Sequence, residues 1–182
     1  MKFTFFFFFL TLYTLWFLLT LSSPMKYLLL WLIFNLMIMT IAYALNNPKF
    51  ILGKKHDGSI NYFLLFINLP WLLFSWFVFY LQMLISRENR VDRIGETFIS
   101  IASKPARNFD YSSYDIVADL TAEFLKDRIG DVEYIAYPNL DGMPLSKGDK
   151  DVTIFKNKKV LVHCANGHGR SALFVARLLV DY

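Results

Sequence analysis

The sequence predicts a helical membrane segment followed by an α/β domain, and three observations support this fold class. The first 85 residues contain three long apolar runs separated by short polar stretches. Only six of the 19 basic and 15 acidic residues lie in this part. Near the end of the chain, an apolar run at 160–163 precedes a loop with two glycines and a second apolar stretch, the pattern of a buried strand, a loop and a helix. We therefore expect about three transmembrane helices in 1–85 and an α/β domain in 86–182.

The three apolar runs cover 3–21, 27–45 and 62–85, and each has about the twenty residues that a helix needs to cross a bilayer. The first run suits either a spanning helix or a signal segment. Because no Ala-x-Ala-like cleavage site follows it, we favour a spanning helix. Pro70 interrupts the third run and predicts a kink that neighbouring helices must cover. We therefore expect an integral, multi-pass membrane protein.

The formal net charge of +4 belongs to the membrane part. Residues 1–85 carry five lysines and one aspartate, whereas the rest of the chain is electrically balanced. A nucleic-acid partner would need a basic face on the globular part, so this distribution excludes that class of function. The polar stretch 49–60 is predicted to be a solvated loop, with contact to anionic headgroups as the alternative. His56 within it has no neighbouring Cys or second His and is expected to be a surface residue, not a metal ligand.

Beyond residue 85 the pattern predicts strands that alternate with helices. The expected elements are strands at 94–102, 116–121 and 132–136, a helical piece at 122–127, a turn-rich loop at 137–144, a polar linker at 147–159, and the strand at 160–163. This alternation is typical of a parallel sheet covered by helices. In such folds a site forms at the carboxyl ends of the strands.

The loop after residue 163 carries the chemistry. Cys164 is the only cysteine, so it forms no intramolecular disulfide. A lone cysteine is more often a buried apolar residue, but two glycines and an arginine beside it favour a reactive thiol. In the Cys164-x5-Arg170 spacing the backbone can curl so that successive N–H groups point inward, and Gly167 and Gly169 permit the dihedral angles and the close approach. The helix that begins near Arg170 adds its positive end, so the loop is predicted to be a phosphate cradle with a nucleophile.

His163-Cys164-x5-Arg170-Ser171 resembles the signature of the cysteine-dependent protein tyrosine and dual-specificity phosphatases. The form His-Cys-Ala-Asn-Gly-His-Gly-Arg-Ser is similar to that of membrane-associated bacterial dual-specificity-like members. The resemblance implies a dual-specificity-phosphatase-like domain in which Cys164 attacks phosphorus and forms a cysteinyl-phosphate. Arg170 would hold two phosphate oxygens, and Ser171 would ease the departure of sulfur in the second step.

Other loop positions receive weaker assignments from the same resemblance. His163 would organise the loop and favour the thiolate, or it is a satisfied core histidine. His168 would add a pH-dependent positive charge near the substrate, or it only fills the loop. Ala165 and Asn166, with the two glycines, would contribute backbone N–H groups to the phosphate.

The general acid is assigned to Asp141. The segment 140–144 resembles the acid loop of the family, in which an aspartate moves over the phosphate, and Gly142 suits such a movement. Three other aspartates compete for the role: Asp131, Asp149 and Asp151. Asp119 and Glu123 lie in a stretch similar to another family segment and are expected to be structural.

The end of the domain departs from the family. Relatives usually have a helix where this chain has the polar linker 147–159, and they continue with further helices beyond the position of Tyr182. We therefore expect a domain that is incomplete at its C-terminus, with exposed apolar side chains on the last helix: Leu173, Val175, Leu178 and Leu179.

The short tether after residue 85 would hold the site near the headgroups. Phosphorylated lipids, such as phosphatidylglycerophosphate or a phosphoinositide, are therefore the expected substrates, with phosphoproteins as the alternative. A catalytically inactive module that binds phosphate is a further alternative. We expect no metal or other cofactor. Three crossings would put the N-terminus and the domain on opposite sides, and four basic residues on each face do not decide the orientation. A reactive thiol favours a cytoplasmic domain.

Overall fold

The computed structural model describes residues 2–21, 24, 26–86, 90–145 and 152–181. Its N-terminal part contains α1 (Lys2–Thr20), α2 (Lys26–Ala44), the single-turn α3 (Lys49–Leu52) and α4 (Tyr62–Ile85). Among the described residues, α1, α2 and α4 are long and apolar enough to cross a membrane. The three apolar runs of the sequence are therefore helices with nearly the expected bounds, and a mixed α/β domain follows them.

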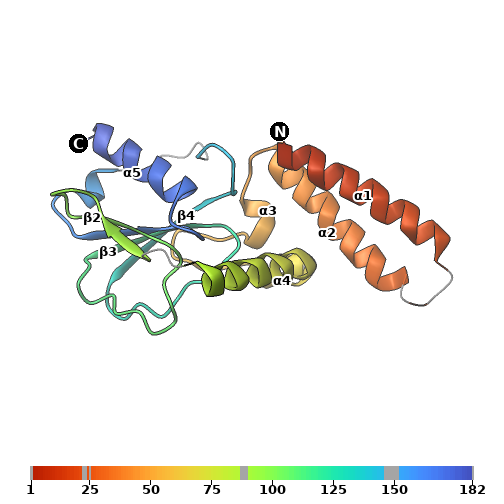
Figure 1. Ribbon diagram of the computed structural model, residues 1–182, viewed down its shortest axis with the longest axis horizontal. Helices are drawn as coiled ribbons and strands as arrows, with labels where there is room; N and C mark the ends of the chain where they lie inside the picture. The colour runs from red at the N-terminus through yellow and green to blue at the C-terminus, as the bar shows by residue number, and fades with distance from the viewer. Residues whose placement is uncertain (1, 22–23, 25, 87–89, 146–151, 182) are drawn as a thin grey trace.

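Helices α1 and α2 form an antiparallel hairpin that projects away from the α/β domain (Figure 1). The start of α1 lies beside the domain, where the ring of Phe3 packs against Gly142. The end of α1 and the start of α2 are the parts farthest from the domain. Aromatic side chains fill the junction with α4, because the fully buried Phe7 contacts the rings of Tyr43 and Trp71.

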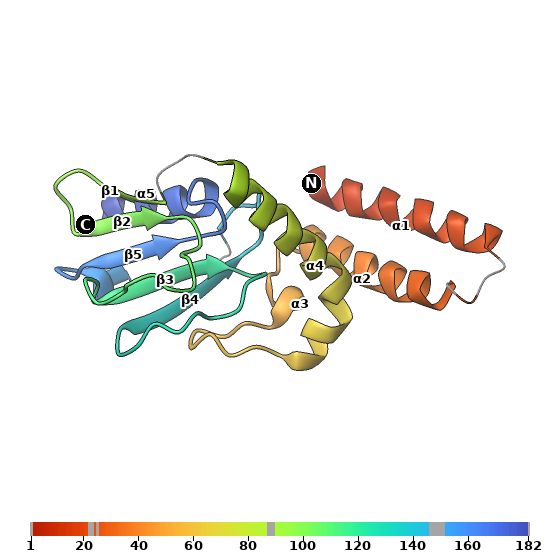
Figure 2. The ribbon, with the colours of Figure 1, turned by 60° about the horizontal axis from the view of Figure 1, so that its bottom comes forward.

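Helix α4 crosses the hairpin steeply instead of running alongside it (Figure 2). Two buried asparagines fix the crossing, since Asn35 of α2 donates to Asn68 of α4 at 2.8 Å. Pro70 disturbs the helical hydrogen bonds near it, and α2 satisfies the groups concerned. Trp31 donates to the carbonyl of Ile67 at 3.1 Å, and Asn35 accepts from the N–H of Trp71 at 3.2 Å. The expected cover of this proline by a neighbouring helix is confirmed.

The described part of the domain contains a five-stranded sheet with the order β1-β2-β5-β3-β4. Its strands are β1 (Val91–Arg93), β2 (Ile99–Ala102), β3 (Ile116–Thr121), β4 (Glu133–Asn139) and β5 (Val160–His163). Strands β2, β5, β3 and β4 are parallel, and β1 is an antiparallel edge strand. The carboxyl ends of the parallel strands point toward α4 (Figure 2).

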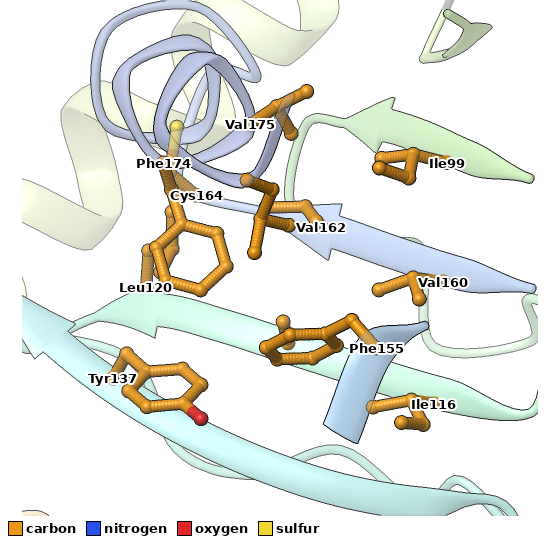
Figure 3. Packing of buried hydrophobic residues seen from close by; sticks show 12 residues of the cluster. Ile99, Ile116, Leu120, Tyr137, Phe155, Val160, Val162, Cys164, Phe174 and Val175 are labelled. Carbon is orange, nitrogen blue, oxygen red and sulfur yellow. The ribbon is translucent and has the colours of Figure 1, made fainter. Parts of the chain in front are cut away.

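Helix α5 (Gly169–Asp181) and the 3₁₀ helix η1 (Val152–Phe155) help to enclose the core on one face of the sheet. Figure 3 shows Phe155 and the α5 residues Phe174 and Val175 over the side chains of β5 and β3. Every residue of β3 and β5 is buried, as expected for central strands of a parallel sheet with both faces covered.

Several of the expected elements differ in the structure. The strand expected at 94–102 is formed only at 99–102, as β2, and residues 94–98 connect it to β1, a strand at 91–93 that was not expected. The segment 122–127 is not helical, because the carbonyls of Glu123, Phe124 and Leu125 accept hydrogen bonds from distant side chains. Strand β4 continues to Asn139, through part of the expected loop. Of the expected linker 147–159, residues 147–151 lie outside the described residues and 152–155 form η1.

The apolar side chains of α5 also differ from expectation. Val175 and Leu178 are buried in the core, whereas Leu173 and Leu179 are exposed. The buried and exposed positions alternate as the helical period requires, so the sheet already covers one apolar face of α5.

Candidate functional site

The loop Cys164–Arg170, which we call the cradle loop, connects β5 to α5 at the carboxyl edge of the sheet. The end of β2 holds it in place, because the N–H of Lys104 donates to the carbonyl of Ala165 at 2.8 Å. Gly167 has a φ of 77°, and a Cβ there would lie 2.7 Å from the backbone nitrogen of Ser103. Both its conformation and its close approach to β2 therefore require glycine. Gly169 has neither a positive φ nor a neighbour within 4 Å, so this part of its predicted role is wrong.

Cys164 is only 3% exposed and packs in the core cluster with Val162 and Phe174 (Figure 3). The thiol that the sequence favours as reactive is therefore buried among core side chains. Ser171, in the first turn of α5, is fully buried, and its Oγ has no hydrogen-bond partner among the described residues.

Arg170 is 2% exposed and is held by a carboxylate. Its Nη1 and Nη2 donate to the two oxygens of Glu123 at 2.9 and 2.7 Å, and Nη1 also donates to the carbonyl of Asn139 at 3.0 Å. Burial opposes the charge of Arg170, but the Glu123 carboxylate more than offsets burial and keeps the pKa of the guanidinium above its usual range. The arginine is therefore a fixed cation.

The bidentate contact leaves one edge of the guanidinium open. Nε–H and the second N–H of Nη2 lie on the same edge, and Nε has no hydrogen-bond partner among the described residues. Two parallel N–H groups on one edge match two oxygens of a tetrahedral oxyanion. Arg170 can therefore bind an anion side-on while Glu123 holds its other edge.

Asp141 lies at this open edge. Its Oδ1 is 3.4 Å from Arg170 Nε, and its side chain is 69% exposed. The structure thus brings the preferred acid candidate to the cradle loop. Among its competitors, Asp131 lies before β4, at the opposite edge of the sheet, and Asp149 and Asp151 lie outside the described residues. Phe3 of α1 packs against Gly142, so the membrane hairpin also contacts this loop.

Glu123 is the residue of the site that sequence reasoning underrated. Burial alone would raise the pKa of Glu123, but Arg170 outweighs burial and lowers it, so the carboxylate is charged. Trp76 of α4 donates to the Glu123 carbonyl at 2.9 Å. The stretch Asp-Leu-Thr-Ala-Glu-Phe at 119–124 was the available signal in the sequence for this residue. It did not reveal the role of Glu123, because its partner Arg170 lies 47 residues away along the chain.

His163 is buried at the end of β5, and its Nδ1 has no hydrogen-bond partner in the described part of the chain. Its Nε2 lies 3.8 Å from Asp119 Oδ1. Burial lowers the pKa of His163 below its usual value, and the attraction of Asp119 offsets only part of this effect. His163 is therefore a neutral core residue beneath the cradle loop.

The stretch 49–60 is not the fully solvated loop that was expected, because Lys54 within it is buried. Its side chain is 1% exposed and forms a 2.5 Å ion pair with Asp119 on β3. Lys54 Nζ also donates to Phe124 O at 2.9 Å and to Thr121 O at 3.2 Å. The lysine thus fixes the segment that carries Glu123, which in turn holds Arg170. His56 in the same loop is exposed, as expected.

The other two polar residues of the cradle loop face α4 and its surroundings. Asn166 Nδ2 donates to Gln82 Oε1 at 3.3 Å, so Asn166 offers a side-chain contact besides its backbone. His168 is exposed and lines a cavity of about 410 Å³ with Arg90 and Ser103. This cavity adjoins the one that Arg170 lines, because Phe79, Gln82 and Asn166 line both.

A groove of about 360 Å³ joins the site to the membrane helices. At one end it is lined by Glu123, Asp141, Ala165, Asn166 and Arg170. The rest of its wall is almost entirely apolar and comes mainly from α1, α2 and α4: Phe3, Phe6, Phe7, Met39, Tyr43, Trp71, Phe74, Ser75, Val78 and Phe79. We call this cavity the helix groove.

Comparison with protein-family models gives no match, and comparison with curated proteins finds no similar sequence. Within the described part of the chain, no three His, Cys, Asp or Glu side chains form a group that could hold a metal ion. The chemistry available at the cradle loop therefore comes from a thiol, a fixed guanidinium and a carboxylate.

Proposed function

We propose that the protein is a membrane-bound phosphatase that hydrolyses phosphate monoesters of lipids through a cysteinyl-phosphate intermediate. The main support for this proposal is the position of the Arg170 guanidinium. Glu123 binds its Nη1 and Nη2, and its Nε edge, which could bind a phosphate, faces Asp141 Oδ1 at 3.4 Å. The resemblance of the 163–171 motif to the phosphatase signature supports the same chemistry.

In the first step the Cys164 thiolate attacks phosphorus while the bond to the ester oxygen breaks. The Asp141 carboxyl group donates its proton to that oxygen, and the alcohol leaves. Arg170 balances the charge of the phosphoryl oxygens. In the second step water attacks phosphorus, Asp141 takes up a proton from it, and the sulfur departs as a thiolate that can accept a hydrogen bond from Ser171. Because Cys164 is 3% exposed, the cradle loop must open to admit the substrate.

The arrangement of the helices supports a membrane topology with two crossings. The loop before α4 contacts the domain through Lys54 and Asp119, and the end of α4 contacts it through Gln82 and Asn166. A helix with both ends against one domain does not carry the chain across a bilayer. We infer that α1 and α2 cross and that α4 lies near the interface, with the N-terminus and the domain on the same side.

This topology makes the charge distribution informative. Among the described lysines and arginines that are exposed in or next to the membrane helices, Lys2, Lys49, Lys55, Arg90 and Arg93 are on the domain side, and Lys26, at the start of α2, is at the far end of the hairpin. Basic residues are enriched on the cytoplasmic side of membrane proteins. The proposed domain is therefore cytoplasmic, in agreement with the reducing environment that a reactive thiol needs.

Hydrolysis of an aryl phosphate by the purified full-length chain in detergent tests the chemistry. We expect turnover that Cys164→Ser abolishes and that the surface control Lys55→Met leaves unchanged. Phosphate binding without turnover would contradict the proposal and favour an inactive binding module. Turnover of phosphopeptides without turnover of a long-chain lipid phosphate would support the phosphatase activity but contradict the proposal that the substrate is a lipid.

A further inference from the structure

The helix groove has a polar end and an apolar body. Arg170 and Asp141 lie at the polar end, where Gln82 contacts Asn166. From Gln82 the groove follows α4 back to Trp71, a helical distance of about 17 Å. Along this length α4 contributes the rings of Phe74 and Phe79. The body of the groove is therefore mainly apolar, with the hydroxyl groups of Tyr43 and Ser75 among its aromatic and aliphatic side chains.

The walls of the groove come mainly from the three long apolar helices α1, α2 and α4. Phe6 and Phe7 of α1 and Met39 of α2 face α4 across it. All three helices are apolar over a length sufficient to span a bilayer, and α4 crosses the hairpin steeply beside the carboxyl edge of the sheet. The volume of about 360 Å³ lies at the lower end of the range for small-molecule sites, so the groove suits part of an extended chain.

From this geometry we propose that the helix groove binds a hydrocarbon chain of a phosphate-ester lipid that enters sideways from the bilayer. The phosphate end of this assignment rests on the proposed function, because Arg170 must bind the ester phosphate. The occupant follows from complementarity: an anionic group meets the fixed cation, and an apolar chain of the same molecule lies among aromatic side chains. The groove thereby selects phosphate monoesters that carry a long chain.

Ser75 gives a way to fill the groove without removing a core side chain. It is a small, partly buried residue of α4 that lines the groove, and within the described residues its hydroxyl group bonds only to the helical carbonyl of Leu72. Ser75→Trp would place a large ring among Phe74, Val78 and Phe79. Phe77→Trp is the matched control, since Phe77 lies on the same helix, is 65% exposed and does not line the groove.

The kinetic test compares a long-chain phosphatidic acid with a tail-less aryl phosphate, using the full chain in nanodiscs. We expect Ser75→Trp to lower kcat/KM for the lipid about tenfold, the equivalent of excluding roughly two methylene groups, and to leave the aryl phosphate unchanged. Phe77→Trp should change neither substrate. An equal effect of Ser75→Trp on both substrates, or no effect on the lipid, would overturn the proposal that the helix groove binds a hydrocarbon chain.

A binding test separates this inference from the proposed function. The Cys164→Ser chain in nanodiscs is exposed to a phosphatidic acid with a photoreactive group in the middle of its chain, and labelled peptides are identified by mass spectrometry. We expect labelling of 71–82 that Ser75→Trp reduces and Phe77→Trp does not. Equal labelling of the Ser75→Trp and Phe77→Trp variants would overturn lipid binding in the helix groove even if the enzyme is active. Reduced labelling in Ser75→Trp alone would support lipid binding in the groove even if no phosphate is hydrolysed, and in that case only the catalytic proposal would fail.

Discussion

At the scale of single residues, the site depends on charges that neutralise each other inside the protein. Arg170 and Glu123 form a bidentate pair, and the other edge of the guanidinium makes no hydrogen bond within the described residues but faces Asp141 Oδ1 at 3.4 Å from Nε. A buried ion pair contributes little net stability, but removing one partner leaves an uncompensated charge. Glu123 is therefore a positioning residue for Arg170.

Glu123→Gln tests this role. The amide keeps the shape of the side chain but leaves the Arg170 charge unpaired, so we expect kcat/KM for an aryl phosphate to fall by about one hundredfold, or roughly 2.7 kcal/mol of transition-state stabilisation. Glu133→Gln is the control, because the ion pair of Glu133 with Lys158 is exposed and contributes little. Equal activities of the two variants would show that Arg170 needs no carboxylate to position it.

His163 makes stability depend on pH. Burial depresses its pKa in the folded chain below the ordinary value of 6.5, so the unfolded chain binds a proton that the folded chain does not. Stability is then fully present above about pH 6.5 and is lost as the pH falls below it, by up to about 1.4 kcal/mol per pH unit.

The measurement is the thermal unfolding midpoint in detergent at pH 7.5 and pH 5.5. We expect a fall of about 2–4 °C for each kcal/mol lost, a smaller fall in His163→Gln, and an unchanged fall in His56→Gln, because His56 is exposed. Identical pH dependence in wild type and His163→Gln would refute the assignment of the effect to His163.

At the scale of elements, the loop between α3 and α4 is joined to β3. Lys54 binds Asp119 and the carbonyls of Thr121 and Phe124, and this segment presents Glu123 to Arg170. The membrane part and the cradle loop are therefore connected by a chain of contacts. Lys54 fixes the end of β3 and the segment after it, and Glu123 in this segment binds Arg170 of the cradle loop.

Lys54→Met breaks the first of these steps. We expect a loss of about 3–5 kcal/mol, because Asp119 stays buried without its cation, and a lower unfolding midpoint reports the loss. Lys55→Met, at an exposed neighbouring position, should stay within about 0.5 kcal/mol of wild type. Adding Asp119→Asn to Lys54→Met should recover part of the loss, and a double variant no more stable than Lys54→Met would argue against the pair.

Some of these elements could be predicted from the sequence and others could not. The three apolar helices and the unit of β5, cradle loop and α5 were predictable, because length, periodicity and turn residues are local signals. The pairings of Lys54 with Asp119 and of Arg170 with Glu123 join residues 65 and 47 positions apart. No local pattern encodes such contacts, so 49–60 was interpreted as a solvated loop and 122–127 as a helix.

At the scale of the whole molecule, the proposed topology depends on the orientation of α4. Its apolar composition predicted a third crossing, since length and hydropathy alone do not distinguish a spanning helix from one that lies along the interface. The contacts at both of its ends support two crossings. The cradle loop would then face the headgroup region, with the helix groove open to the acyl chains.

Cysteine labelling tests the two-crossing topology. In a Cys164→Ser background, single cysteines replace Lys2, Lys26, Lys55 or the exposed Arg107 of the domain, and intact cells are treated with a thiol reagent that does not cross membranes. We expect labelling at position 26 only. Labelling at just one of positions 55 and 107, which lie before and after α4, would show that α4 crosses the bilayer after all.

The most direct test of the central claim is to trap the covalent intermediate. The Ser171→Ala chain, in which the departure of sulfur in the second step should be slowed, is placed in nanodiscs, mixed with a phosphatidic acid carrying a radioactive phosphate, quenched in acid within the first turnover, and digested. We expect one phosphoryl group on the peptide that contains Cys164, and none in the Cys164→Ser control. Label on another peptide, or hydrolysis of the lipid that persists in Cys164→Ser, would contradict it.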